Sequence, residues 1–165
     1  NLNRLDACIE LFNPKKIIFI GDLFHSEANT EWDDFHDWRT RHRTLSMTLA
    51  LGNHELYSPQ KYEALGLKVA SHVDLNGLRF RHQPEPSGAK PIESSEVSAS
   101  ICGHLHPGIK LAGKGKQRLV LPCFAHYEQQ LILPAFGTFT GLHMITMKEA
   151  LQLYAIAENE LIALK

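Results

Sequence analysis

The chain has 165 residues, of which 44% are hydrophobic and 21% charged, and its formal net charge at pH 7 is −1. This composition excludes a disordered chain and a disulfide-stapled miniprotein, and the near-neutral charge excludes a global positive field toward nucleic acid. The length suits a single domain, 1–165. Three widely spaced cysteines favour a reducing cytoplasm, and no apolar run is long enough to cross a bilayer, so we expect no membrane contact.

The first half of the chain alternates between helical periodicity and short continuous apolar runs of the kind that buried parallel strands show. Helices are expected over 2–12, 30–43 and 58–66, and strands over 17–20 and 45–51. This order predicts an α/β layer with a parallel sheet. A parallel strand needs a crossover before it, so we expect the first helix to end a crossover whose leading strand is missing from this chain.

The second half is richer in strands, which Gly, Pro and polar stretches separate. Strands are expected over 68–73, 78–82, 97–102, 119–124, 130–133, 142–147 and 151–156. A long polar loop over 83–96 interrupts them. The two halves together predict an α/β sandwich of two mixed sheets packed face to face, with helices outside.

Three glycine-led motifs stand where a strand should pass into a loop. They are Gly21-Asp22-Leu23-Phe24-His25, Gly52-Asn53-His54-Glu55 and Gly103-His104-Leu105-His106, and His82 ends a further strand. Ligands of open α/β sheets gather at the carboxyl ends of strands, so these loops could converge. Such a set of one carboxylate, one amide and several imidazoles suits Mn²⁺, Fe or Zn²⁺ better than Mg²⁺ alone. Taken singly, each motif is better explained by turn formation; taken together, they favour a metal site.

In this order, the motifs resemble the signature of the calcineurin-like metallophosphoesterases, which hydrolyse phosphoesters with two metals. The stretch from Gly21 to Ser26 is similar to the Mre11-type nucleases. The segments 103–108, 121–124 and 133–137 resemble the bacterial ligase-associated DNA damage response endonucleases, and this resemblance covers about 1–147. It implies a four-layer α/β/β/α sandwich.

The resemblance also implies a role for each matching residue. Asp22 would bridge two divalent metals, of which Mn²⁺ is the first choice and Fe, Zn²⁺ and Mg²⁺ are alternatives. Asn53, His82 and His104 would complete one metal site, and His106 would bind the other metal. His54 would face the phosphate as a catalytic residue that stabilises charge or protonates the leaving oxygen, and His25 would lie beside the substrate strand.

The chain departs from this family in one respect. The Asp-x-His motif of the first strand, which supplies the other ligands of the second metal, is absent. Asp34-Phe35-His36 does not replace it, because it lies inside an expected helix, where residues two apart point in different directions. We therefore expect one complete metal site, weak binding of the second metal and weak activity from this chain alone.

Two basic clusters admit simpler interpretations. Arg39, Arg41, His42 and Arg43 are expected at a solvated helix end, where cations favour the helix dipole. A hairpin after the third motif could hold a phosphate backbone or could be a solvated turn. Its cations are Lys110, Lys114, Lys116 and Arg118. We expect Trp32 and Trp38 to pack against the sheet.

The function that this pattern favours is a metal-dependent phosphodiesterase that hydrolyses DNA through a binuclear centre with a bridging hydroxide. The family association implies a role in DNA repair, with a DNA ligase, a helicase and an exonuclease as partners, and a homodimer is a further candidate assembly. Two alternatives stay open. One is a phosphoesterase for small molecules such as cyclic nucleotides, and the other is a non-catalytic scaffold of the same fold.

Overall fold

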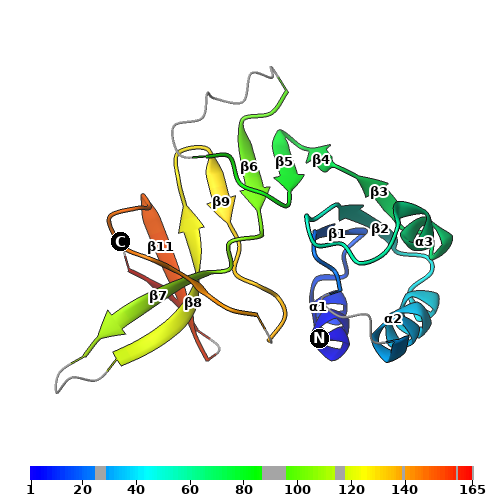
Figure 1. The fold of residues 1–165 in the computed structure, drawn as a ribbon, viewed down its shortest axis with the longest axis horizontal. Helices are drawn as coiled ribbons and strands as arrows, with labels where there is room; N and C mark the ends of the chain where they lie inside the picture. Colours follow the sequence, from blue (N-terminus) through cyan, green and yellow to red (C-terminus); the bar gives the residue numbers. More distant parts are fainter. Residues whose placement is uncertain (25–28, 87–95, 114–117, 139, 159, 165) are drawn as a thin grey trace. The chain divides into compact units, whose positions relative to one another are not determined.

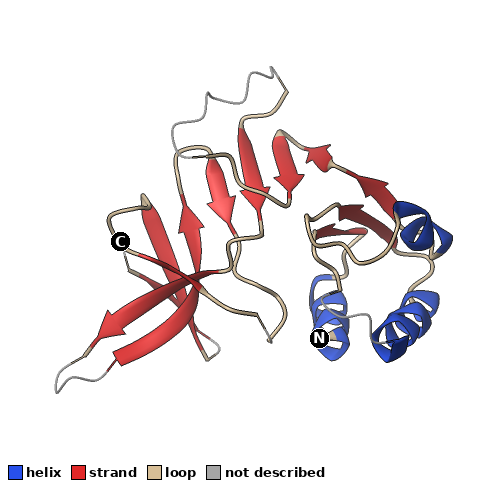
Figure 2. Ribbon diagram, in the orientation of Figure 1, coloured by secondary structure: helices blue, strands red, loops and turns tan. Residues whose placement is uncertain are grey.

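The computed structural model describes all 165 residues except 25–28, 87–95, 114–117, 139, 159 and 165. Contacts divide the chain into two compact units. Unit 1 comprises Asn1–Val73 and Phe80–His82, and unit 2 comprises Asp74–Arg79 and Gln83–Lys165. Helices belong to unit 1 and strands dominate unit 2 (Figure 2), so within the described residues the fold is α/β with two sheets.

Unit 1 alternates helices and strands as its sequence periodicity predicts (Figure 1). Its elements are α1 (Leu2–Phe12), β1 (Lys16–Ile20), α2 (Asn29–Arg41), β2 (Ser46–Ala50), α3 (Pro59–Ala64) and β3 (Lys68–Ala70). The strands pair in the order β1-β2-β3, and both pairs are parallel. Ile20 lies opposite Ala50, so β1 and β2 end at the same edge of the sheet. The loops that follow these two strands therefore start side by side.

The core of unit 1 is aromatic. Trp38, Leu49 and Tyr62 are fully buried, with Phe24 and Phe35 nearly so, and α1 adds Leu2, Leu5 and Ile9 to the same cluster. The prediction that Trp32 and Trp38 pack inward is confirmed. Helix α3 begins with Pro at its first turn and ends before Gly66, whose φ of 75° is a left-handed value that favours glycine.

Unit 2 is built mainly of strands. They are β4 (His72–Leu75), β5 (Leu78–Arg81), β6 (Ala99–Cys102), β7 (Pro107–Ala112), β8 (Arg118–His126), β9 (Gln130–Ile132), β10 (His143–Ile145), β11 (Gln152–Ala157) and β12 (Glu160–Ala163). Strands β4 and β5 are each divided between the two units. The last residues of β5, and His82 directly after them, belong to unit 1. The strand order is β10-β7-β8-β9-β6-β5-β4, and β11 pairs with β8 and β12.

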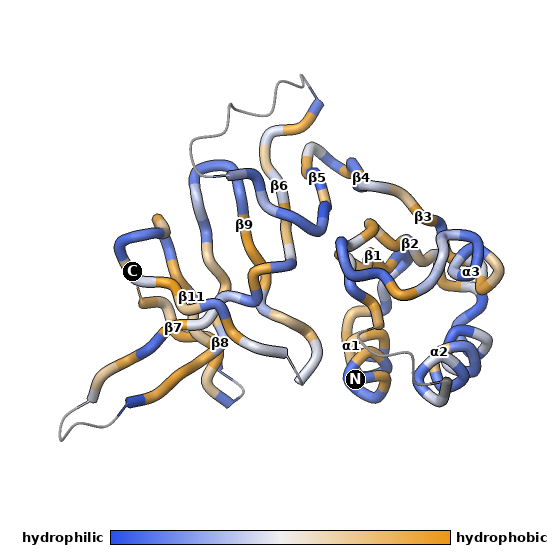
Figure 3. Tube along the Cα trace, in the orientation of Figure 1, coloured by the Kyte–Doolittle hydropathy of each residue, from blue (hydrophilic) through white to orange (hydrophobic). Residues whose placement is uncertain are grey.

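The core of unit 2 lies along β8, β9 and β11. Cys123, Ala125, Leu153 and Ala155 are fully buried there, together with Cys102 of β6. Figure 3 shows hydrophobic colour along β9, one of the strands of this core. The three cysteines are free thiols, and burial raises the pKa of Cys123 to about 11, so this thiol stays protonated at neutral pH.

Two expectations about local structure are wrong. The end of α2 is not simply solvated. Arg39 is only 8% exposed and donates hydrogen bonds to the carbonyls of His42 (2.5 Å) and Gly66 (3.2 Å), which tie the helix end to the turn after α3. The other error is the single strand expected over 68–73, which is two strands, β3 and β4, separated at Ser71.

Candidate metal centre

Two loops at the carboxyl edge of the unit 1 sheet carry the predicted ligands. Asp22 follows β1 after one residue, and Asn53 and His54 follow β2 after two. Since β1 and β2 are neighbouring parallel strands in register, these side chains start from the same edge. The chain order of the motifs therefore becomes spatial proximity within unit 1.

Glycine is required in front of each of these ligands. A Cβ on Gly21 would overlap the imidazole of His82 and lie 2.8 Å from the Cα of Gly52. A Cβ on Gly52 would overlap the carboxylate of Asp22 and lie 2.5 Å from its backbone nitrogen. Both glycines thus leave room for the ligands themselves, which is a packing reason for the two motifs beyond turn formation.

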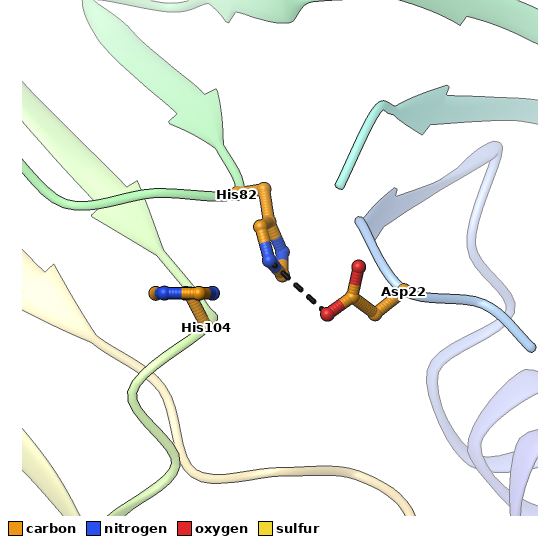
Figure 4. A group of neighbouring side chains, drawn as sticks. All are labelled: Asp22, His82 and His104. Atoms are coloured by element: carbon orange, nitrogen blue, oxygen red, sulfur yellow. Dashed lines mark ion pairs between the residues drawn. The ribbon is translucent and has the colours of Figure 1, made fainter. Parts of the chain in front are cut away.

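Each oxygen of the Asp22 carboxylate has a close polar neighbour. Its Oδ1 accepts a hydrogen bond from the backbone N–H of His54 at 3.1 Å, and its Oδ2 lies 3.3 Å from His82 Nε2 (Figure 4). The Asp22 side chain is 9% exposed. Its backbone has φ 49°, an uncommon value for any residue except glycine, which Asp adopts more readily than most. Such a strained backbone is a frequent companion of functional sites.

His82 reaches this site from the end of β5, and its side chain is only 3% exposed. Its Nδ1 lies 3.0 Å from the carbonyl oxygen of Ile20, so Nδ1 carries a proton and donates it to that oxygen. In the neutral ring Nε2 then has a lone pair, and it faces Asn53 Oδ1 at 2.9 Å as well as Asp22 Oδ2. A carbonyl that fixes the tautomer in this way is typical of histidines that bind metals.

Three lone-pair atoms therefore converge in unit 1: a carboxylate oxygen, an amide oxygen and an imidazole nitrogen. With no positive charge among them they would repel one another. A cation bound by all three atoms would remove this repulsion. The mixture of oxygen and nitrogen donors fits a divalent transition metal, so the residues present suit the metal that the sequence predicts.

The third motif lies in unit 2, in the loop between β6 and β7. Figure 4 also draws His104, which belongs to unit 2. His104 has φ 64° and His106 has φ 47°, so both histidines adopt the left-handed conformation. The backbone N–H of Leu105 bonds to the carbonyl of Gly103 at 2.8 Å, and that of His143 bonds to the carbonyl of His106 at 3.0 Å. These bonds define a tight turn that leads into β7.

The remaining predicted site residues have different outcomes. The His54 residue is exposed, and only its backbone contacts Asp22. Lys110 on β7 and Arg118 on β8 are exposed on one hairpin. His25, Lys114 and Lys116 lie outside the described residues. Asp34-Phe35-His36 lies within α2, as expected, with Phe35 buried and its two neighbours exposed.

Sequence reasoning assigned no role to Glu55 or Tyr62, yet both belong to the structure of this site. The Tyr62 hydroxyl donates a hydrogen bond to Glu55 Oε2 at 2.6 Å. The sequence pointed to Glu55 in part, because this residue is the last of the second motif. It did not point to Tyr62, which lies seven residues later in a helix, where an aromatic residue usually indicates a core position.

Unit 1 is thus an α/β layer with a candidate metal site at the ends of its strands, which is the usual place for a ligand site in such a fold. No family model and no curated protein matches the chain. Among solved structures, the chain is similar to the nuclease MPE of Pseudomonas putida. The identity is 30% and the TM-score is 0.79, over 99% of this chain and 78% of that chain. At this identity and coverage, the chain belongs to the same family as that nuclease.

Proposed function

We propose that this protein is a metal-dependent nuclease of the metallophosphoesterase class that hydrolyses phosphodiester bonds of DNA. The observation that carries the proposal is the convergence of Asp22 Oδ2, Asn53 Oδ1 and His82 Nε2 in unit 1. The similarity to a nuclease supports the substrate class. The motif resemblance supports the superfamily, its binuclear centre and its four-layer sandwich in a single domain.

The proposed ligands extend from unit 1 to the third motif. Asp22, Asn53 and His82 would hold one metal, which His104 would join by the motif resemblance, and Asp22 and His106 would contribute to the second. For the two unit 2 histidines, the support is the Gly103-His104-Leu105-His106 motif and its strained turn. Mn²⁺ is the first choice, because the donors are mixed oxygen and nitrogen.

When bound, divalent cations would neutralise charge on the phosphate and favour formation of a nucleophile from water at neutral pH. The chain's own residues hold and orient that site. Asp22 is fixed by the His54 N–H, and Ile20 fixes the His82 tautomer. The His54 side chain, on an exposed residue, is the proposed general acid toward the departing oxygen. A role beside the substrate strand is proposed for His25.

DNA contact is proposed for the basic hairpin of β7 and β8. Lys110 and Arg118 are exposed, and Lys114 and Lys116 stand between them in the sequence. Cations that contact phosphates make binding fall steeply with salt.

Several further predictions rest on the sequence. They are the repair role, the ligase, helicase and exonuclease partners, the homodimer and the cytoplasmic location. Among the described residues, no helix has the length and apolarity to traverse a membrane.

The test compares wild type, Asp22→Asn and Asp34→Asn, each stripped with chelator and titrated with Mn²⁺ by calorimetry. Asp34 is an exposed carboxylate on α2 and provides the matched control. Wild type and Asp34→Asn should bind Mn²⁺, while Asp22→Asn should lose more than about 100-fold in affinity, because a direct ligand should cost more than an outer contact. A hundredfold excess of Mn²⁺ over Kd should stabilise wild type by about 2.7 kcal/mol.

The same proteins are then assayed on bis(p-nitrophenyl) phosphate and on an oligonucleotide at increasing salt. Hydrolysis of the oligonucleotide that needs Mn²⁺ and Asp22, and that falls with salt, supports the proposal. Hydrolysis of the small diester alone favours the small-molecule phosphoesterase. Mn²⁺ binding without hydrolysis favours the scaffold, and hydrolysis that survives both chelator and Asp22→Asn contradicts a metal mechanism.

A further inference from the structure

The loop that presents Asn53 and His54 is closed by the carboxylate of Glu55. One oxygen, Oε1, accepts a hydrogen bond from the backbone N–H of Gly52 at 3.3 Å. The other, Oε2, accepts the hydroxyl of Tyr62 at 2.6 Å. Glu55 thus joins the start of its own loop to helix α3, and the two ligand-bearing residues lie between its contacts.

Tyr62 is well placed to act as a fixed anchor. The residue is fully buried, and its ring packs against the rings of Phe24, Trp32 and Tyr57. Burial, with help from the neighbouring Glu55, raises the pKa of the phenol above its ordinary 10.0, so the hydroxyl stays protonated and donates. This hydroxyl therefore holds the loop at residue 55.

What this anchor holds is the geometry of the candidate metal centre. Asn53 places its amide oxygen 2.9 Å from His82 Nε2, and His54 directs its backbone N–H at Asp22 Oδ1. Both contacts depend on the path of the loop between Gly52 and Tyr57. Neither residue is otherwise covered, since Asn53 and His54 are exposed. The hydrogen bond from the buried Tyr62 hydroxyl to Glu55 therefore ties this loop to the core of unit 1.

We propose that Tyr62 is a positioning residue of the metal centre, which acts through Glu55 to hold Asn53 and the His54 backbone in the geometry that binds metal. This inference rests on the proposed function. Outer-shell partners of metal ligands typically contribute 10- to 100-fold in metal affinity, so the expected effect is large enough to measure.

The test measures Mn²⁺ affinity by calorimetry and thermal unfolding of the metal-free protein for wild type, Tyr62→Phe, Glu55→Gln and Tyr154→Phe. Tyr62→Phe keeps the buried ring and removes only the hydroxyl. Tyr154→Phe makes the same change on β11 in unit 2 and is the matched control. Tyr62→Phe should weaken Mn²⁺ binding by about tenfold, and Glu55→Gln, which keeps one acceptor oxygen, should fall between it and wild type.

A second readout separates positioning from a purely structural role. On the oligonucleotide, Tyr62→Phe should lower kcat at saturating Mn²⁺ with little change in KM, because phosphate contacts are untouched. Unfolding of Tyr62→Phe at lower temperature, with unchanged Mn²⁺ affinity and kcat, overturns the inference but leaves the proposed function intact. If Tyr62→Phe does not fold, unchanged Mn²⁺ affinity in Glu55→Gln overturns it. Failure of wild type to bind Mn²⁺ overturns both, and is recognised because it appears before any variant is compared.

Discussion

The two loops that carry the predicted ligands, one in each unit, are stabilised in different ways. In unit 1, side chains fix the 52–57 loop. Glu55 and Tyr62 close it by hydrogen bonds, and the Asp22 carboxylate accepts a hydrogen bond from the backbone N–H of His54. In unit 2, the loop over 103–106 is a tight turn whose two histidines both have positive φ. A left-handed residue other than glycine costs on the order of 1–2 kcal/mol, so the unit 2 turn stores strain at both of its histidines.

The two units therefore contribute differently to the order of the predicted ligands. Asp22, Asn53 and His82 are arranged by unit 1 alone, down to the tautomer of the histidine. The candidate metal site of unit 1 is therefore formed by residues of that unit alone. Substitutions in the two loops should then have unequal consequences.

The largest effect is expected from Gly52→Ala. The new Cβ would overlap the Asp22 carboxylate and press on its backbone nitrogen, neither of which can move without breaking the site. We expect a loss of about 3 kcal/mol in the free energy of unfolding and loss of Mn²⁺ binding. Urea denaturation and calorimetry measure the two. Gly141→Ala, where a Cβ meets nothing within 4 Å, is the control.

A smaller effect is expected from Gly108→Ala, the corresponding change next to the unit 2 turn. The new Cβ would meet the end of the Met144 side chain and come within 2.9 Å of Leu142 Cβ. Met144 is 43% exposed and can swing away, whereas Leu142 Cβ can move only with its backbone, so we expect a loss of about 2 kcal/mol by urea denaturation. A cost equal to that of Gly52→Ala would remove the contrast between the loops.

The smallest effect is expected at the contact of α1 with α2, far in sequence from either loop. Asp6 Oδ1 accepts hydrogen bonds from Trp38 Nε1–H at 2.6 Å and His42 Nε2 at 2.8 Å. Partial burial alone would raise the pKa of Asp6, but these bonds and the charge of His42 outweigh it and lower the pKa below 3.8.

Because the folded-state pKa is the lower one, Asp6 stabilises the protein above about pH 3.8, and this contribution is lost as the pH falls further. Asp6→Asn should therefore cost about 0.5 kcal/mol at pH 7, a modest value for a partly exposed group, and less at pH 3. Thermal unfolding at the two pH values measures the difference. A deficit that grows on acidification would contradict this assignment.

Much of the fold was predictable because its periodicity is strong. The helix over 2–12 matches α1, and both buried apolar runs of the first half are strands of the parallel sheet. Strand β7 was missed, since Pro107 and Gly108 read as loop residues. Pro is tolerated there because it is the first residue of the strand. Strand β12 was missed because it is short and every residue in it is exposed.

The site was predictable where its ligands are side chains in sequence motifs. It was not predictable where a backbone atom or a partner distant in sequence fixes a side chain. The motifs led to Asp22, Asn53 and His82, which unit 1 brings together. The carbonyl of Ile20 leaves no signature in a sequence, since every residue has one. Arg39 likewise looked like a solvated cation, because its acceptors are carbonyls of a turn and of a glycine 27 residues away.

The link between His82 and Ile20 spans 62 residues of chain. Closing so long a loop costs entropy that must be met before the contact forms, so this link belongs among the later events of folding. During synthesis, a nascent chain that has emerged only as far as α3 displays Asp22 and Asn53 without the imidazole. Tight binding of a transition metal should therefore begin only when β5 docks, so we expect metal binding to coincide with the completion of unit 1 folding.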